Sequence, residues 1–424
     1  MEGVPNTGVP MSDTMETLSE ADAAAFRQRC REFLDANATG LPGARRGSAG
    51  DDRGKALLDG AKKFQKALAD AGLAGLTYPK EFGGQGLSRA YDRIWREEYG
   101  RYPEMTSELT ISHGMCLPVL NDFGTTEQRK QFLGKNISGE HVWCQMFSEP
   151  GAGSDVASLQ TRAERDGDEW VINGQKVWTT LAHLSDYGIL IARTNPDVPK
   201  HAGISMFIVD MKDPAVEIRA IHQIDGGMHF NEVFFTNLHI PADWLVGELN
   251  NGWNQATAML MYERVAIGTG SSSGVSHPNA DHLIEEATKR ERIGDPLLRQ
   301  GLMRLYSEET TKSLVAMRTR AEMKAGRAPG PGGSLGKLHG ARIARMMRTL
   351  TGEVFEADLQ AYAPGDKAEA WARSVISSFA SNIAGGTDEI QKNIIGDRVL
   401  GLPREPAVDR DVAFRDLRVG TEQR

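Results

Sequence analysis

The chain has 424 residues, of which 40% are hydrophobic and 25% are charged, a composition typical of globular proteins with a packed core. Its formal net charge of −8 disfavours nonspecific binding of nucleic acid, although local arginines can still bind a phosphate. The sequence has neither an apolar run near the roughly 18–20 residues that span a bilayer nor a signal peptide, so we expect a soluble, cytoplasmic protein.

The first third of the chain has the hydrophobic period of helices. We expect a first helix capped by Ser19, with Asp22 in its first turn. The buried face of this helix consists of Phe26, Cys30, Phe33 and Leu34. A second helix is expected to end with Gly72 as its C-cap, and its buried face consists of Leu57, Leu58, Ala61, Phe64 and Leu68. A third helix is predicted at about residues 125–133.

From about residue 142 the pattern changes to that of β-strands, which are rich in β-branched and aromatic residues. The predicted strands cover residues 142–147, 187–193, 203–210, 216–221 and 231–240. The segment 169–178 contains Asn173-Gly174, the strongest short signal for a β-hairpin. We therefore predict a hairpin that turns at Asn173-Gly174, and Pro241 ends the β block.

From about Gly252 the pattern is helical to the end of the chain. A long helix is predicted from Pro296 to about Ala325, and its inward face consists of Leu298, Leu302, Leu305 and Tyr306. A Pro/Gly turn at 326–333 precedes helices at about 335–362, 367–382 and 388–398. The predicted fold class is α+β, with an N-terminal helical domain at residues 1–141, a middle β domain at 142–251 and a C-terminal helical domain at 252–424.

A glycine-rich segment follows the first predicted strand, in the sequence SEPGAGSD at 148–155. Gly151-Ala152-Gly153 resembles half of a dinucleotide-binding fingerprint, but Val156 stands at the third glycine position and hairpin strands follow instead of a helix. A Rossmann unit is therefore excluded. The segment is either an ordinary surface loop or a loop whose backbone N–H groups and hydroxyls, at Ser148 and Ser154, bind a planar polar ligand.

Trp178, Thr179 and Thr180 follow at the end of the predicted hairpin. A tryptophan followed by hydroxyls suits one face of a ring system, but a core tryptophan beside threonines of high β-propensity gives the same pattern. The three cysteines, Cys30, Cys116 and Cys144, lack the spacing of metal ligands, so no metal site is expected.

Four segments, in order and at their spacing, resemble the acyl-CoA dehydrogenase family. They are SEPGAGSD, the ING-QK-W-T-T pattern from residue 172, GLTYPKEFGGQGLS at 75–88 and GGTDEIQKNIIGDRVLGLPRE at 385–405. The resemblance covers roughly residues 15–405. It implies an α-helical N-domain, a β-barrel-like middle domain and a C-terminal four-helix bundle, which is the order of blocks found above.

The resemblance also implies FAD, bound between the middle and C-terminal domains. The residues that match contacts of the flavin ring are Gln145, Phe147, Ser148, Gly153, Ser154, Trp178 and Thr180. Ser154 matches a contact of the acyl-CoA as well. Thr387 and Glu389 match a C-terminal turn that approaches the cofactor, and Thr387 equally suits a helix N-cap.

The family reaction needs a carboxylate that removes a proton next to the thioester. Many members carry this glutamate directly before the Gly-Thr of the C-terminal motif, where this chain has Gly385. A smaller group carries it on the first long helix of the C-domain, directly before an arginine, and Glu263 and Arg264 match that pattern. We expect Glu263 to be the base and Arg264 to contact the substrate; the alternatives are a surface glutamate and a surface salt bridge.

The site for the adenosine part of FAD departs from the family. Members supply Arg-x-x-Phe-Gly across a subunit interface, whereas this chain reads Arg290-Glu291-Arg292-Ile293-Gly294 and keeps only the arginine, Arg290, as a cofactor contact. The usual Gln-x-x-Gly-Gly-x-Gly is also degenerate, in RTLTGEVFEADL at 348–359. In branches that form heteromeric assemblies, including some that act on steroid side-chain thioesters, one type of subunit supplies part of a flavin site and the other type completes it.

The sequence thus predicts an FAD-dependent acyl-CoA dehydrogenase that produces a trans-2-enoyl-CoA and passes electrons to an electron-transferring flavoprotein. We expect a homo- or hetero-oligomer, a dimer or a tetramer. Gly385 hints at room for branched or polycyclic acyl groups in fatty acid or steroid side-chain degradation. The alternatives are a non-catalytic or half-site subunit of a heteromeric dehydrogenase and a flavin monooxygenase of the same fold.

Overall fold

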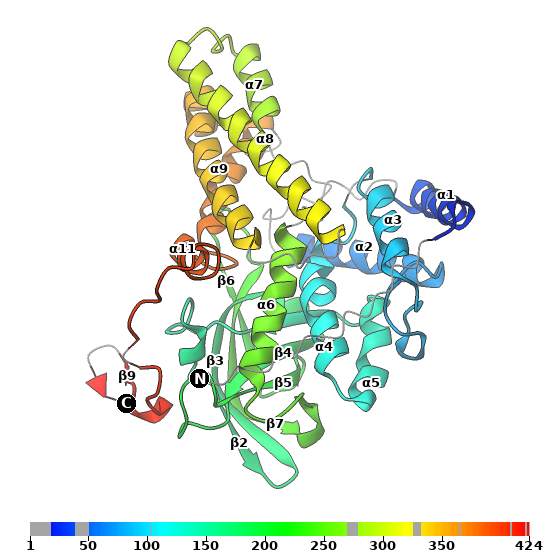
Figure 1. The fold of residues 1–424 in the computed structure, drawn as a ribbon, viewed down its shortest axis with the longest axis vertical. Helices are drawn as coiled ribbons and strands as arrows, with labels where there is room; N and C mark the ends of the chain where they lie inside the picture. The colour runs from blue at the N-terminus through cyan, green and yellow to red at the C-terminus, as the bar shows by residue number, and fades with distance from the viewer. Residues whose placement is uncertain are drawn as a thin grey trace.

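The structure is a computed structural model in which helices surround and extend from one β-sheet (Figure 1). The helices of the first third lie beside the sheet, and a long helical hairpin projects away from it. The residues that the structure describes are 18–38, 51–102, 104–268, 279–324, 332–363, 366–407, 409–419 and 422–423. Among them, no helix has the length and apolar character needed to cross a bilayer.

The N-terminal helices start and end where local signals place them. They are α1 (Glu20–Asn37), α2 (Asp51–Asp70), α3 (Arg89–Tyr99), α4 (Leu117–Phe123) and α5 (Thr126–Ile137). The Ser19 hydroxyl caps α1 and accepts a hydrogen bond from the Asp22 backbone at 3.1 Å, as predicted. Gly72, which follows α2 with a φ of +65°, confirms the predicted C-cap.

A buried carboxylate joins α1 to α3. Glu98 has no exposed side-chain surface, and its oxygens lie 2.5 Å from Arg27, 2.8 Å from Arg31 and 3.1 Å from Arg101. The hydrogen bond from Arg31, together with those from the other arginines, lowers the pKa of Glu98 to about 2 in spite of its burial. The carboxylate is therefore charged at neutral pH and fixes the packing of the two helices.

The middle of the chain forms one mixed eight-stranded sheet. Its strands are β1 (Trp143–Met146), β2 (Arg162–Asp166), β3 (Glu169–Thr180), β4 (Tyr187–Arg193), β5 (Ile204–Asp210), β6 (Val216–Ile221), β7 (Phe230–Pro241) and β8 (Leu245–Val246). The order is β6-β7-β3-β2-β4-β5-β8, and β1 pairs in parallel with β4. Alternate residues of β4 pack into two different hydrophobic cores. Ile189 packs with residues of the N-terminal helices, and Leu190 packs with residues of the other strands.

The predicted hairpin at Asn173-Gly174 is wrong. Strand β3 runs through both residues, with a register shift against β7 there, and the turn from β2 to β3 is at Gly167, which has a φ of +55°. The glycine at 174 serves close packing instead, because a Cβ there would lie 2.4 Å from the Thr161 hydroxyl. The Asn173 side chain accepts a hydrogen bond from the Asn237 backbone at 2.9 Å, and the extra residue of the bulge lies in β7, where Thr236 and Asn237 face the single residue Asn173.

The C-terminal helices follow the predicted order. They are α6 (Gly252–Gly268), α7 (Ala280–Lys289), α8 (Pro296–Lys324), α9 (Gly332–Phe355), α10 (Lys367–Ser377) and α11 (Asp388–Arg398). The helices predicted to end at 362 and 382 end earlier, in short 3₁₀ turns. The Pro/Gly turn expected at 326–333 lies largely outside the described residues. Tyr306, predicted to face inward, is 46% exposed, because it lies one step around α8 from the buried Leu305.

The expectation of helix to the end of the chain is also wrong. After α11 the chain is mostly extended and returns to the sheet, where it forms a 3₁₀ turn at Phe414–Asp416 and the strand pair β9 (Arg418–Val419) and β10 (Glu422–Gln423) (Figure 1). Pro403 and Pro406 explain the change, because proline interrupts helical hydrogen bonding. The C-terminal segment thereby contacts the middle of the chain.

Candidate functional site

The glycine-rich loop begins where β1 ends. Gln145 is half-buried on β1 and Phe147 is buried, whereas Gly153 and Ser154 are exposed. Glu149 and Ala152 exchange backbone hydrogen bonds of 3.0 and 3.1 Å, which close the loop into a tight turn. No atom lies within 4 Å of the position that a Cβ on Gly153 would occupy. The backbone of the loop is therefore open to a ligand.

A buried ion pair attaches this loop to β3. The Lys176 ammonium lies 2.8 Å from the Glu149 carboxylate and donates to the Phe147 carbonyl at 3.0 Å. Glu149 also accepts backbone hydrogen bonds from Gln160 at 2.6 Å and Thr161 at 2.9 Å. Burial would raise the pKa of Glu149, but Lys176 and these hydrogen bonds lower it. The pair joins the SEPGAGSD and QK segments, and the sequence reasoning did not identify it.

The end of β3 brings a tryptophan to the loop. The Val177 N–H donates to the Ser148 carbonyl at 2.9 Å, so β3 lies directly beside the start of the loop. The next residue, Trp178, is 58% exposed, has a φ of +60°, and meets the Phe230 ring edge-on at 6.0 Å. A left-handed backbone at a large residue is strained, and such strain is concentrated at functional sites. Thr180 follows, half-buried.

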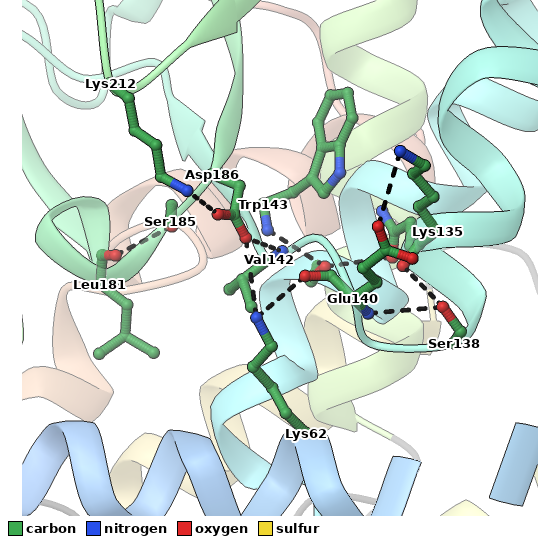
Figure 2. Close-up of polar contacts among 12 residues, drawn as sticks. Lys62, Lys135, Ser138, Glu140, Val142, Trp143, Leu181, Ser185, Asp186 and Lys212 are labelled. Carbon is green, nitrogen blue, oxygen red and sulfur yellow. Dashed lines mark hydrogen bonds and ion pairs between the residues drawn. The ribbon is translucent and has the colours of Figure 1, made fainter. Parts of the chain in front are cut away.

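Strand β1 is anchored at its other end, where β4 also begins (Figure 2). The Asp186 carboxylate accepts a hydrogen bond from the Val142 backbone at 2.9 Å and pairs with Lys212 and, at 3.9 Å, with Lys62. Lys62 comes from α2 and also donates to the Glu140 carbonyl at 2.9 Å. Burial would raise the pKa of Asp186, but Lys212 and Val142 lower it. This cluster fixes the start of β1 against α2 and the sheet.

The C-terminal turn before α11 is held by side chains that the sequence reasoning did not single out. Asp388 is buried and accepts hydrogen bonds from Arg345 at 2.5 Å and Asn382 at 3.0 Å. Gln391 donates to the Gly385 carbonyl at 2.8 Å. Gly385 has a φ of +66°, so a larger side chain at this position would be strained.

Of the two predicted residues in this turn, Thr387 is the N-cap of α11 and accepts from the Ile390 backbone at 3.3 Å, which confirms the capping interpretation. Its role toward a cofactor stays a prediction. Glu389 is exposed, and its nearest charged partner is Lys392 at 4.0 Å. Thr387 and Asp388, rather than Glu389, therefore determine the local structure.

Glu263 and Arg264 lie on α6, and their side chains lie outside the described residues. Helix α6 packs against β5, α4 and α9, so it connects all three parts of the chain. Just before the pair, the Tyr262 hydroxyl donates to Asp122, which links α6 to the helix α4. The roles of Glu263 and Arg264 stay predictions.

Arg290 lies after α7, at the end of the helical hairpin that points away from the sheet (Figure 1). Its guanidinium forms an ion pair of 2.5 Å with Asp358 and covers the Phe355 ring at 4.1 Å. Arg292 pairs with Glu356. The two arginines are thus neutralised by acids from the degenerate segment 348–359, and the structure does not bring Arg290 near the loop of its own chain. No group of potential metal ligands occurs among the described residues.

Three domain models of one family match the chain in order. They are the acyl-CoA dehydrogenase N-terminal domain at residues 20–140, middle domain at 144–238 and C-terminal domain at 250–400. Acyl-CoA dehydrogenase IpdE1 of Mycobacterium tuberculosis (strain ATCC 25618 / H37Rv) is 39% identical over 388 residues, which cover 91% of this chain and 99% of that protein. The chain belongs to the acyl-CoA dehydrogenase family. It is therefore an FAD-dependent oxidoreductase, as the sequence predicted.

Two solved structures show the same fold in acyl-CoA dehydrogenases of more than one subunit. The Tcur3481-Tcur3483 steroid ACAD has a TM-score of 0.70 and 27% identity, over 92% of this chain and 99% of that chain. The ChsE4-ChsE5 complex from Mycobacterium tuberculosis has a TM-score of 0.68 and 26% identity, over 92% of this chain and 100% of that chain.

The residues at the loop fit the FAD of this family. An exposed, strained Trp178 offers a face to a planar ring, and the open backbone at Gly153 permits close approach of polar ring atoms. Ser148 and Ser154 add hydroxyls on the same loop. The assignment of the flavin site to β1, β3 and the loop between β1 and β2 stays a prediction, with which these features agree.

Proposed function

We propose that this acyl-CoA dehydrogenase removes the α-proton and β-hydrogen of an acyl-CoA thioester and produces a trans-2-enoyl-CoA. The observation that carries the proposal is the junction of the glycine-rich loop with the end of β3, where a hydrogen bond of 2.9 Å joins Val177 to Ser148. This hydrogen bond supports the proposal, because it brings the exposed Trp178, the residue after Val177, close to the start of the loop.

In this proposal FAD is held by residues of the loop, β1 and β3, with the C-terminal turn nearby. These residues are Gln145, Phe147, Ser148, Gly153, Ser154, Trp178, Thr180, Thr387 and Glu389. Bound FAD supplies the acceptor for the β-hydride. Ser154 and Arg264 orient the thioester.

Glu263 is the proposed base that takes the α-proton. A glutamate with its ordinary pKa of about 4.3 is a weak base, and burial beside the acyl chain would raise that pKa and strengthen it. Position 385 cannot supply the carboxylate, because it is a glycine in a left-handed turn. Glu263, on a helix in contact with β5 and α9, is the alternative that the sequence offers.

The proposed substrate class is a branched or polycyclic acyl-CoA, such as a thioester from steroid degradation. Gly385 has no side chain at the position where many family members carry a glutamate beside the substrate, so the site has more room. The similarity to a steroid ACAD, at a TM-score of 0.70, supports the same class.

We also propose that the chain works in an assembly with a second subunit and passes electrons to an electron-transferring flavoprotein. Arg290 and Arg292 are paired with Asp358 and Glu356 within the chain, so they are poorly disposed to bind a phosphate of FAD. The similarity to the ChsE4-ChsE5 complex agrees with two kinds of subunit. The same observation favours a second candidate function, a half-site subunit that stabilises a dehydrogenase partner.

The first experiment is a visible spectrum of the purified chain, followed by anaerobic addition of acyl-CoA thioesters with straight, branched and polycyclic acyl groups. We expect a yellow protein whose absorbance near the flavin maximum decreases with a polycyclic thioester. A colourless protein that becomes yellow only with a partner subunit would instead support the half-site function.

The role of Glu263 is tested with Glu263→Gln. We expect unchanged FAD content but a slower decrease of flavin absorbance, by about 10²–10⁴-fold, because general bases commonly contribute this much. Glu285→Gln is the matched control, since Glu285 is exposed on α7 and forms a surface ion pair with Lys289, one turn along the same helix. Reduction at the rate of the unmodified enzyme would exclude Glu263 as the base.

A further inference from the structure

The C-terminal segment is seated on the connection between β4 and β5. The Phe414 N–H donates to the Val198 carbonyl at 2.9 Å, and the Arg415 N–H donates to the Pro196 carbonyl at 3.0 Å. After α11 the chain returns to its middle part, and residues 409–417 are hydrogen-bonded there (Figure 1). The same connection also contacts the glycine-rich loop, through Lys200 and Asp155.

One contact between the segment and the loop is an ion triad. The Lys200 ammonium lies 2.7 Å from Asp409 and 2.8 Å from Asp155, the last residue of SEPGAGSD. The Lys200 side chain is only 12% exposed, and Ser158 adds a hydrogen bond of 2.6 Å to Asp155. Because two carboxylates share one shielded cation, the position of Asp155 depends on both partners of Lys200.

A second contact uses a buried arginine. Arg193, at the end of β4, donates to the Ala157 carbonyl at 2.5 Å and to the Lys200 carbonyl at 2.5 Å. The Phe414 ring covers the guanidinium at 3.7 Å. Ala157 lies two residues beyond Asp155, so the C-terminal segment reaches both ends of the short stretch that follows the glycines. The two contacts differ in chemistry and meet at Lys200, whose ammonium belongs to the ion triad and whose carbonyl accepts from Arg193.

We propose that the segment 409–417 orders the glycine-rich loop for FAD, with Lys200 and Arg193 as positioning residues. The proposal rests on the function proposed above, in which this loop binds the flavin. A loop with two glycines loses much conformational freedom when it is fixed, and a ligand that must order it binds more weakly. Contacts from the C-terminal segment order the loop before FAD arrives, so they strengthen FAD binding without touching it.

The test uses Asp409→Asn and Phe414→Leu in the full chain. We expect each variant to show faster backbone hydrogen exchange at residues 151–158 after removal of flavin, and a dissociation constant for FAD raised by about tenfold, a typical effect of losing about 1.4 kcal/mol of preorganisation. Asp409→Glu keeps the charge and should restore both values most of the way.

Arg415→Gln is the matched control, because the Arg415 side chain pairs with Asp197 at 2.8 Å on the same connection instead of with Lys200 or Arg193. Unchanged exchange at 151–158 in both test variants would overturn the proposal. Faster exchange with unchanged FAD affinity would also overturn it, and would show that the failure lies in the flavin role of the loop rather than in the contacts of the C-terminal segment.

Discussion

At the scale of single residues, Lys176 and Glu149 form the contact on which the candidate flavin site depends most. Neither side chain is appreciably exposed, and the ammonium group has two acceptors, Glu149 and the Phe147 carbonyl. A buried ion pair adds little net stability compared with apolar residues, but loss of one partner leaves the other charge buried without compensation. The pair therefore acts mainly to hold the loop and β3 in one arrangement.

Lys176→Met is expected to lower the free energy of unfolding by about 3 kcal/mol, the lower end of the range for breaking a buried pair. The lower end applies because Glu149 keeps its hydrogen bonds from Gln160 and Thr161. Urea denaturation measures this loss, and the variant should also bind FAD more weakly.

Two comparisons make this prediction specific. Lys66→Met, which removes the exposed pair with Asp70, should change stability by less than about 1 kcal/mol. The double variant Lys176→Met, Glu149→Gln should lose less than the sum of its single variants, because the two sites are coupled. Additive losses would contradict the ion pair as the cause.

Residue-level prediction from the sequence succeeded where the signal is local. Ser19 and Thr387 are N-caps because a hydroxyl next to the first helical turn satisfies a free backbone N–H, whatever the rest of the fold does. The partners of Lys176 and Asp388 could not be predicted, since each ion pair joins segments that only the tertiary structure brings together. A lysine within an apolar strand was the signal available for the first of them.

At the scale of elements, β3 shows why a turn signal can mislead. Asn-Gly is favoured in tight hairpins because both central residues need a positive φ. Here the same dipeptide lies inside β3, opposite a bulge in β7, and Gly167-Asp168 provides the actual turn. Gly-Asp is also a signal for a two-residue hairpin turn, so the sequence contained the correct turn as well as the wrong one. The close approach of Thr161 to Gly174 decided between them, and it is not visible in a linear pattern.

Gly174→Ala is expected to destabilise the protein by about 2–3 kcal/mol, because the new Cβ would lie 2.4 Å from the Thr161 hydroxyl and 2.6 Å from its Cα. Gly167→Ala is the matched control: it also adds a methyl group at a positive φ, but no atom lies within 4 Å. The control should lose only about 1 kcal/mol through backbone strain. Equal losses in thermal or urea unfolding would refute the packing role of Gly174.

At the scale of the whole molecule, the hydrophobic period predicted the three successive blocks, because helices and strands differ in period regardless of their partners. The family fold came from the resemblance of the four motifs. The hydrophobic period missed the return of the C-terminal segment to the sheet. That segment has few apolar residues, and its attachment depends on Phe414, Lys200 and Asp409 meeting across the fold. The segment contacts the connection between β4 and β5, far from it in the sequence, and the hydrophobic period does not reveal such a contact.

The arginines after α7 concern the contact between this chain and an FAD bound at a subunit interface. Arg290 matches a residue that family members offer to the diphosphate of FAD across an interface. In this chain it is engaged by Asp358 at 2.5 Å and by the Phe355 ring. To reach a phosphate, the guanidinium must leave Asp358, so the carboxylate competes with the cofactor.

Asp358→Asn should therefore strengthen FAD binding by the purified chain by about twofold to fivefold, since an exposed ion pair is worth up to about 1 kcal/mol. Titration of the flavin-free protein with FAD measures the change, and Glu285→Gln makes the same charge change on α7 without touching Arg290. The increase should disappear when Arg290→Gln is combined with Asp358→Asn. Unchanged affinity in Asp358→Asn would mean that Arg290 makes no contact with FAD, and that a second kind of subunit must supply the cation for the diphosphate.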